Sequence, residues 1–317
     1  RGRLALKLPM ARRSDLAIVL NPSAGGGYDE RRVEALRAIA GSRGVVFSTG
    51  QRELLDAVAQ GVRERRVATV AIIGGDGTVS NVLTALHHAY RGDPLPRVAL
   101  LRGGTMNTIA NSFGVARAQP EELLRRLVAS PSYTLIERAT VQVENRLGFF
   151  FCAGAMVAFL RVLYESAGQK QGPLGALRLL AKGSFQAFAG GQLLDRIDLP
   201  LSATLRIDGV EHPARRYAVL GAGTIEQAGL GFRPFPLAGE CQDQMQMFAF
   251  LGTMQALARQ LPSIRRGLPV QKGLAIAPLI RTLEIETSGE PIAYALDGDI
   301  YEAGSVLRVD TGPTLEI

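Results

Sequence analysis

The segment Gly74–Thr78, with the sequence Gly-Gly-Asp-Gly-Thr, constrains the fold of this chain more than any other. It follows the apolar, β-branched run Val67–Ile73 and precedes the helix-like stretch Val79–Tyr90. This order predicts a strand, a glycine turn and the start of a helix. Glycines leave the backbone of the turn open to a bulky anion, and a helix N-terminus adds N–H groups and a partial positive charge. We therefore predict a nucleotide phosphate site here, with a purely structural turn as the alternative.

Asp76 places a carboxylate where the phosphate is expected. Two like charges can share a site when a divalent cation lies between them. The sequence therefore predicts that Asp76 holds a magnesium ion that accompanies the nucleotide.

Strand-like and helix-like segments alternate in the first 130 residues or so. Strands are predicted at 16–20, 45–48, 67–73 and 98–101, and helices at 29–40, 51–66, 79–90 and 120–129. Repeated units of this kind form a parallel sheet covered by helices, with ligands at the carboxyl ends of the strands. Polar, glycine-bearing loops follow those ends at 21–27, 49–50, 74–78 and 103–107. Their convergence predicts one site at one edge of the sheet.

The pattern changes after Pro131. Tyr133–Glu144 alternates with period two, and further short segments of this kind follow as far as Val306–Val309, separated by turn residues. This pattern is typical of an antiparallel β domain. We expect a first domain at residues 1–131, a second at 132–310, and a return of the extreme C-terminus, about 311–317, to the first domain.

Composition narrows the class of partner. The net charge of +7 favours anionic partners, whereas the aromatic content of 6% and the absence of Trp argue against nucleic acid. The two cysteines exclude a disulfide framework and a cysteine-rich zinc site. The longest uncharged stretch, Leu147–Leu160, is too short to span a bilayer, and Arg1–Arg13 has no apolar segment of a secretory signal. A cytoplasmic protein is expected.

Four loops together resemble the diacylglycerol kinase catalytic-domain family, which includes sphingosine and ceramide kinases and bacterial lipid kinases. Gly74–Thr78 is identical to the family's Gly-Gly-Asp-Gly-Thr signature. Asn21–Gly25 resembles its opening Asn-Pro loop, Gly103–Asn107 its Gly-Thr-x-Asn loop, and Asp297–Asp299 its late Asp-Gly-Glu segment. The order and spacing of these loops make the resemblance specific over most of the chain.

The resemblance implies an α/β nucleotide-binding domain of the phosphofructokinase and NAD-kinase type, followed by a β-sandwich domain, with the active site in the cleft. It implies ATP with Mg2+ as cofactors and transfer of the γ-phosphate to the hydroxyl of a diacylglycerol-like, sphingoid or ceramide lipid, as in phospholipid biosynthesis. The implied nucleotide-binding residues are Asn21, Ser23, Gly25, Thr49, Gly74, Gly75, Asp76, Gly77, Thr78, Ser80, Thr105 and Asn107.

The same resemblance assigns catalytic roles to three carboxylates. Asp297 corresponds to the family's base and Asp299 to its acidic neighbour, while Asp76 belongs to the signature loop. Asp243 lies in a segment that resembles one carrying a structural magnesium ion in some bacterial members. From the residues alone, Asp297-Gly298 is better explained as a hairpin turn, and its catalytic role rests on its placement in the family motif.

The chain departs from the family where acidic residues are common. Ser80-Asn81 replaces an Asn-Glu pair, Thr108 replaces an Asp, and Met156 stands in a segment that resembles Gly-Phe-Asp-Ala. Two alternatives therefore stay open. One is a lipid- or nucleotide-binding protein without kinase activity. The other is a soluble kinase related to NAD kinase, against which the Gly-Thr-x-Asn loop argues.

A basic amphipathic segment predicts contact with an anionic membrane. Gly175–Phe188 carries apolar residues on one side, with Arg178 and Lys182 elsewhere, and the region from Arg259 to Lys272 adds further positive charge. Helices of this type lie on anionic bilayers. We expect peripheral membrane association, with packing of the apolar stripe in the protein's own core as the alternative.

Overall fold

The computed structural model describes residues 6–9, 16–24, 27–49, 53–130, 132–166 and 196–317. The chain divides into two compact units. The first unit consists of Arg1–Arg138, Asn145–Leu147 and Pro313–Ile317, and the second of Ala139–Glu144 and Gly148–Gly312. The segment predicted as a membrane-binding helix, Gly175–Phe188, lies outside the described residues.

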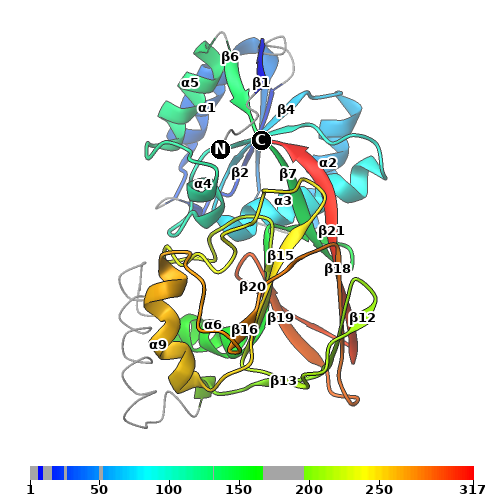
Figure 1. Cartoon of the computed structure of the whole chain (residues 1–317). Coiled ribbons are helices and arrows are strands. Elements are labelled where there is room, and N and C mark those ends of the chain that lie inside the picture. Colours follow the sequence, from blue (N-terminus) through cyan, green and yellow to red (C-terminus); the bar gives the residue numbers. More distant parts are fainter. Residues whose placement is uncertain (1–5, 10–15, 25–26, 50–52, 131, 167–195) are drawn as a thin grey trace. The chain divides into compact units, whose positions relative to one another are not determined.

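A four-stranded sheet forms the centre of the first unit, in the order β3-β2-β4-β5 with every neighbouring pair parallel (Figure 1). Its strands are β2 (Leu16–Leu20), β3 (Gly44–Ser48), β4 (Thr69–Ile73) and β5 (Arg97–Leu100). The central strands β2 and β4 are almost entirely buried, as expected for parallel strands covered on both faces. The predicted α/β domain is confirmed.

Helices follow the strands of this sheet. They are α1 (Glu30–Ala40), α2 (Glu53–Glu64), α3 (Asp76–Tyr90), α4 (Thr108–Ser112) and α5 (Pro120–Ala129), with a short 3-10 turn at Gly41–Arg43. The sequence sets α1 locally: the Asp29 side chain accepts the backbone N–H of Arg32, and Val33, Leu36 and Ala40 form a buried stripe at helical spacing. An ion pair between Arg32 and Glu121 joins α1 to α5 at 2.8 Å.

Two larger antiparallel sheets build the second unit. Their orders are β12-β11-β18-β21-β7-β8 and β16-β15-β14-β9-β19-β20, with β17 also paired to β15. The first contains β7 (Glu137–Val143), β8 (Arg146–Gly148), β11 (Thr204–Ile207), β12 (Val210–Glu211), β18 (Thr282–Glu286) and β21 (Val306–Glu316). The second contains β9 (Phe150–Gly154), β14 (Val219–Gly223), β15 (Met245–Phe250), β16 (Ala275–Ile276), β17 (Leu279–Ile280), β19 (Ile292–Leu296) and β20 (Asp299–Ala303).

Two short pairs complete the strands: β1 (Leu6–Pro9) with β6 (Ser132–Leu135), and β10 (Leu201–Ser202) with β13 (Arg216–Tyr217). The helices of the second unit that the structure describes are α6 (Ala155–Ser166) and α9 (Met254–Arg265).

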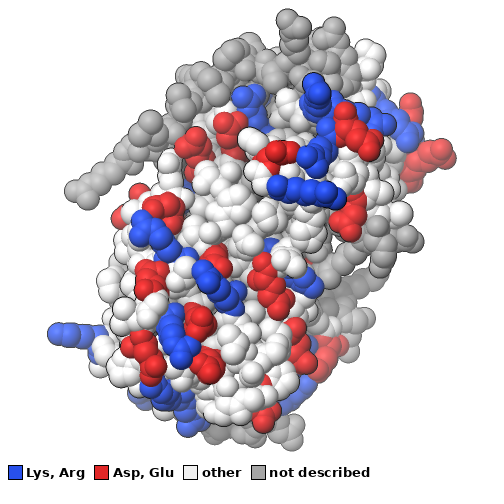
Figure 2. Space-filling view, turned by 90° about the vertical axis from the view of Figure 1, so that its right-hand side faces the viewer, with Lys and Arg blue, Asp and Glu red and all other residues white. Residues whose placement is uncertain are grey.

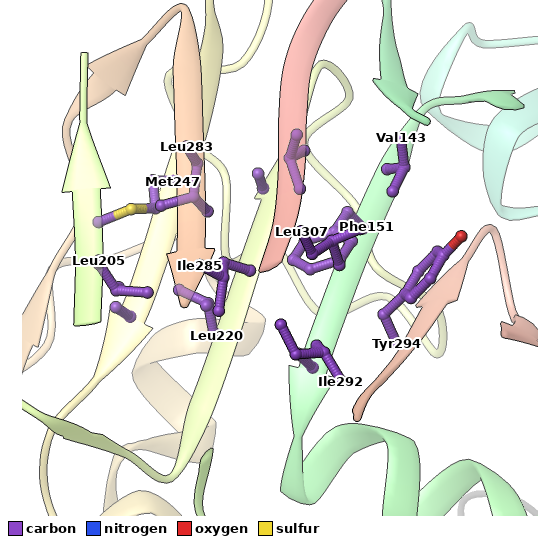
Figure 3. Close-up of a cluster of buried hydrophobic side chains, with 14 of the residues drawn as sticks. Val143, Phe151, Leu205, Leu220, Met247, Leu283, Ile285, Ile292, Tyr294 and Leu307 are labelled. Atoms are coloured by element: carbon purple, nitrogen blue, oxygen red, sulfur yellow. The ribbon is translucent and has the colours of Figure 1, made fainter. Parts of the chain in front are cut away.

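The inner faces of the two large sheets share one apolar core (Figure 3). Leu205, Leu283 and Leu307 come from the first sheet, and they pack in the same cluster as Phe151 and Leu220 from the second. Alternate residues of β18 are buried, as the period-two sequence pattern predicts. This arrangement confirms the predicted β-sandwich.

Helix α6 packs on the second sheet through residues that point away from the shared core. Cys152 and Ala295 are register partners on β9 and β19, and they cluster with Val157 and Leu160 of α6. Since successive strand residues face opposite sides, these residues alternate with Phe151 and its neighbours in the core. The helix therefore covers the outer face of β9 and β19.

Charged residues of both signs mix on the surface. In the face shown in Figure 2, Lys and Arg side chains lie among Asp and Glu side chains. Ion pairs such as Arg206–Glu284 and Arg281–Asp243 account for part of this mixing. Within the described ranges, we find no helix with the length and apolar character needed to cross a bilayer.

Candidate active site

The two glycine loops of the first unit pack backbone against backbone. Gly103 N–H donates to the Gly74 carbonyl at 2.8 Å, next to the pairing of β4 with β5. A Cβ atom on Gly103 would lie 2.7 Å from Gly74 N, and one on Gly104 would lie 2.4 Å from Gly75 Cα. Side chains cannot be accommodated at such distances from backbone atoms. The glycines therefore allow close contact between the two loops, in addition to any access that they give to a ligand.

Helix α3 begins inside the Gly74–Thr78 loop. Its N-cap is Gly75, and no side chain among the described residues caps this end. The first N–H groups of a helix have no partner within the helix, and the macrodipole of the 15-residue α3 adds positive potential there. This end of α3 can therefore receive an anionic group, which fits the phosphates of a nucleotide.

The loop after β2 is joined to the loop after β4. Asn21 Nδ2 donates to Thr78 Oγ1 at 3.1 Å, and Asn21 N–H donates to the Ile73 carbonyl at 2.9 Å. Asn21 Oδ1 also accepts the backbone N–H of Ser23 at 3.0 Å, which turns the loop back on itself. Thr49 follows β3 and is buried, with its N–H bonded to the Leu20 carbonyl. Predicted residues from three loops thus lie at one edge of the sheet, while Gly25 falls outside the described residues.

Asn107 fixes the second glycine loop. Its backbone is in the left-handed region, with φ at 49°. Its side chain accepts the Gly104 N–H at 2.9 Å and donates to the Gly104 carbonyl at 2.5 Å. Thr105, between them, is exposed. Asn107 therefore shapes the loop, whereas Thr105 is accessible to a ligand.

The side chain of Asp76, in the first turn of α3, connects this helix to the start of α4. Its carboxylate accepts the backbone N–H groups of Thr108 and Ile109, each at 2.9 Å. Burial raises the pKa of this carboxyl above its usual value, although the two backbone bonds and the nearby Arg102 favour the charged form. The predicted magnesium role stays a prediction. The structure shows that both carboxylate oxygens already bind the start of α4.

A small cavity lies beneath these loops. Gly74, Asp76, Arg102 and Asn107 are among the residues that line its volume of about 10 Å³. This is the size of one water molecule and far below that of a nucleotide. A nucleotide would therefore lie on the open edge of the loops and not beneath them.

Ser80 faces the interior of the unit. It is 2% exposed, and its hydroxyl donates to the Leu147 carbonyl at 2.6 Å. Thr84, one turn later on α3, accepts the Leu147 N–H at 3.0 Å. The Ser80 hydroxyl thus binds a backbone carbonyl inside the unit, and its contact with the nucleotide stays a prediction.

Asp297 begins the two-residue turn of the β19–β20 hairpin. Asp297 and Gly298 both have positive φ, at 49° and 94°, as a type I′ turn requires. Asp297 is 4% exposed, and its carboxylate accepts the N–H of Phe149 at 3.0 Å and that of Phe150 at 2.9 Å. A Cβ on Gly148 would lie 2.6 Å from Asp297 Oδ2. The turn expected as the alternative is present, and it also holds a buried, amide-bound carboxylate.

The remaining predicted carboxylates have weaker or different partners. Asp299 is partly exposed, and Tyr301 donates to its Oδ2 at a long 3.5 Å. Asp243 forms an exposed ion pair with Arg281, whose hydrogen bond lowers the pKa of this carboxyl. In the part of the chain that the structure describes, no three His, Cys, Asp or Glu side chains gather as a metal site. Asp243 is thus paired with a cation that competes with any metal ion.

Sequence reasoning missed the residues that support these carboxylates. Arg102, with φ at 28°, donates to Asn111 Oδ1 and to the Val115 carbonyl at 2.7 Å each, beside Asp76. Gly148 and the Phe149 and Phe150 N–H groups form the cradle of Asp297. In the sequence, Arg102 is noticeable because it directly precedes a glycine loop, and Gly148 because it interrupts an apolar run. Neither feature identifies the distant carboxylate that the residue supports.

Comparison with known proteins agrees with these features. Residues 15–135 match the family model of the diacylglycerol kinase catalytic domain. The chain is 25% identical to a diacylglycerol kinase of Mycobacterium tuberculosis over 291 residues, covering 88% of this chain and 86% of that protein. It is 29% identical over 196 residues to the probable lipid kinase YegS of Shigella flexneri, covering 60% and 58%. The resemblance predicted from the four loops is confirmed.

Solved structures show the same fold. A crystal structure of a diacylglycerol kinase from Bacillus anthracis covers 95% of this chain, and the chain covers 96% of it, with a TM-score of 0.67 and 15% identity. A putative diacylglycerol kinase from the same organism has a TM-score of 0.69, with 94% and 92% coverage and 15% identity. At this identity the likeness establishes the two-domain fold.

Proposed function

We propose that this chain, which carries a region of the diacylglycerol kinase catalytic-domain family at residues 15–135, is an ATP-dependent lipid kinase. The acceptor is the primary hydroxyl of a diacylglycerol-like, sphingoid or ceramide lipid. The observation that carries the proposal is the close packing of the loops at Gly74–Thr78 and Gly103–Asn107 beside the start of α3, which no described side chain caps. This combination offers an anion site of the kind that nucleotide phosphates use.

ATP supplies the phosphoryl group in this proposal. Positioning and charge neutralisation are the main needs of phosphoryl transfer, and the first N–H groups of α3 provide both for a phosphate. Asn21 and Asn107 hold the surrounding loops through side chain to loop hydrogen bonds. Ser23 and Thr105, both exposed on these loops, are the side chains proposed to contact the nucleotide directly.

Magnesium would enter with the nucleotide. Mg2+ keeps several water ligands and is usually held by phosphates and one or two carboxylates. The described residues fit this mode better than a protein cage, because they contain no cluster of three or more acidic, His or Cys ligands. Asp76 is the proposed protein contribution, through lone pairs that its bonds to Thr108 and Ile109 leave available.

Asp297 is the proposed general base. In the transfer step the lipid oxygen forms a bond to the γ-phosphorus, the bond from that phosphorus to the β–γ bridging oxygen breaks, and the hydroxyl proton passes to the Asp297 carboxylate. Backbone N–H groups from Phe149 and Phe150 orient this carboxylate, and a fixed orientation favours proton transfer. Asp299 follows in the same hairpin as a secondary acidic group.

A kinase assay tests the proposal. The full chain is incubated with γ-labelled ATP, Mg2+ and anionic phospholipid vesicles that carry diacylglycerol, monoacylglycerol, sphingosine or ceramide in separate reactions. Label in a chloroform-soluble product with one of these lipids is the expected result. Co-sedimentation with the same vesicles tests the proposed peripheral membrane association.

Two other outcomes would replace the proposal. Label confined to a water-soluble acceptor would indicate a soluble kinase. ATP binding without any labelled lipid, in Mg2+ or Mn2+, would indicate a binding protein. The neutral residues Asn81, Thr108 and Met156 favour this second candidate.

A further inference from the structure

The hairpin turn at Asp297-Gly298 has anchors on two different elements. The first is the β8–β9 connection, where Phe149 and Phe150 N–H groups bind the Asp297 carboxylate and the Phe150 carbonyl accepts the Asp297 N–H at 3.0 Å. The second is helix α6, from which the Tyr164 hydroxyl donates to the Gly298 carbonyl at 2.6 Å. A side chain outside the sheet therefore holds the residue next to the carboxylate.

The sequence of α6 explains how Tyr164 reaches this turn. Val157 and Leu160 pack against β9 and β19, and Tyr164 lies one turn further along the same helical face. The two elements have similar lengths: β9 is about 17 Å long at 3.3 Å per residue, and the part of α6 from Ala155 to Tyr164 is about 14 Å long at 1.5 Å per residue. Since α6 starts where β9 ends, it returns along the sheet and brings Tyr164 to the opposite end, beside the turn.

Gly298 provides the space for this contact. A Cβ atom there would lie 3.2 Å from the Tyr164 hydroxyl oxygen, and its φ of 94° is strained for any other residue. Tyr164 itself is 48% exposed, and Gly298, whose carbonyl it binds, is partly exposed. The Tyr164 side chain thus buries little apolar surface, and its main contribution is the hydrogen bond that its hydroxyl makes to the backbone of the turn.

We propose that Tyr164 is a positioning residue for Asp297, which it controls by holding the Gly298 carbonyl. This inference rests on the proposed function for its catalytic consequence, but the constraint on the turn exists without it. Loss of the hydroxyl lets the turn move relative to the Phe149 and Phe150 N–H groups, so the carboxylate spends less time in the orientation that accepts the proton. Nucleotide binding, which belongs to the first unit, is not affected.

The test compares Tyr164→Phe with Tyr217→Phe. Tyr217 is a matched control, because its hydroxyl also donates to a backbone carbonyl, that of Ala214, at 2.7 Å. It lies beside Gly154, at the end of β9 away from Phe150, and it is fully buried. Tyr217→Phe should therefore cost at least as much stability as Tyr164→Phe while leaving the turn untouched.

In the kinase assay, we expect Tyr164→Phe to lower kcat about ten-fold with KM for ATP within about two-fold of the unchanged chain, as misplacement of a catalytic group predicts. Tyr217→Phe should keep kcat within about two-fold. A purely structural role would lower kcat in both variants in proportion to the folded fraction, and that pattern would overturn the proposal.

Amide hydrogen exchange provides a second test that needs no activity. In Tyr164→Phe, the N–H groups of Phe149, Phe150 and Asp297 should exchange about ten-fold faster, because opening of the turn exposes them. Tyr217→Phe should leave these rates unchanged. Equal rates in Tyr164→Phe and the unchanged chain would refute the positioning role. If exchange responds as expected but no lipid is phosphorylated by the unchanged chain, the proposed function fails and the constraint on the turn stands.

Discussion

The carboxylate of Asp76, in the first turn of α3, accepts the backbone N–H of Ile109, in the first turn of α4, at 2.9 Å. The neighbouring N–H of Thr108 binds the other oxygen. Asp76 therefore fastens the second glycine loop to the first, whichever ligand the loops hold. A role of this kind predicts effects on stability that are separate from effects on nucleotide binding.

We expect Asp76→Ala to lower the free energy of unfolding by about 1–3 kcal/mol, because it leaves two buried N–H groups without their acceptor. Urea denaturation measures this change. Asp93→Ala is the control, since Asp93 forms an exposed ion pair with Arg63 and should change stability by less than about 1 kcal/mol. Equal effects in the two variants would mean that the bonds to α4 contribute nothing.

The raised pKa of Asp76 predicts a pH dependence of stability. The folded chain binds this proton more readily than the unfolded chain, for which the usual value of 3.8 applies. The contribution of Asp76 to stability therefore decreases as the pH rises from about that value through the folded pKa. The difference in unfolding free energy between the unchanged chain and Asp76→Asn should shrink over this range. A difference that grows with pH would show that hydrogen bonding outweighs burial at this site.

Gly104→Ala should disrupt the contact between the two glycine loops. The added Cβ would lie 2.4 Å from Gly75 Cα, a backbone atom that cannot turn aside, so we expect a loss of about 1–3 kcal/mol in stability. We also expect weaker ATP binding, measured by calorimetry. Gly304→Ala is the control, because among the described residues nothing lies within 4 Å of its added Cβ. Full ATP affinity in a folded Gly104→Ala chain would argue against the loops as the phosphate site.

The two cysteines should differ in reactivity. Burial raises the pKa of Cys152 to about 12, and the nearby Asp297 carboxylate also raises it, whereas Cys241 is partly exposed. Because the thiolate is the reactive form, a thiol reagent at pH 8 should modify Cys241 and leave Cys152 unmodified until the chain unfolds. Mass spectrometry of peptides identifies the site. Rapid modification of Cys152 in the folded chain would show that α6 does not protect the outer face of β9.

Asp297→Asn tests the proposed base. We expect kcat for lipid phosphorylation to fall by about 10²–10⁴, the usual contribution of general base catalysis, while ATP binding is retained. Asp310→Asn is the control, since Asp310 pairs with Arg308 on the surface of the same unit. An Asp297→Asn chain that is folded and keeps full turnover would exclude this residue as the base and leave it a structural role in the hairpin.

Much of the architecture follows from local sequence patterns. The alternation of apolar strands with amphipathic helices predicted the parallel sheet, and period-two alternation predicted strands such as β18. The loop Gly74–Thr78 was identified from its glycines and its position between a strand and a helix. These features are readable because each depends on neighbours within a few residues.

The partners of the candidate site residues could not be read in this way. Ser80 binds Leu147, 67 residues away, and Asp297 binds Phe149, 148 residues away. Nothing in the local sequence distinguishes a serine that faces a ligand from one that faces a backbone carbonyl. Helix rotation and strand register decide this, and both are fixed by packing across the unit.

The sequence by itself thus determined where the chain turns, which segments form strands or helices, and which loops share one edge of the first sheet. Tertiary structure decided that Asp76 caps a second helix, that the glycine pairs contact each other, and that Asp297 lies in a cradle of N–H groups. The physical reason is that secondary structure reports the periodicity of side chains along the chain. Hydrogen-bond partners of buried polar groups depend on which distant backbone groups the fold brings within about 3 Å.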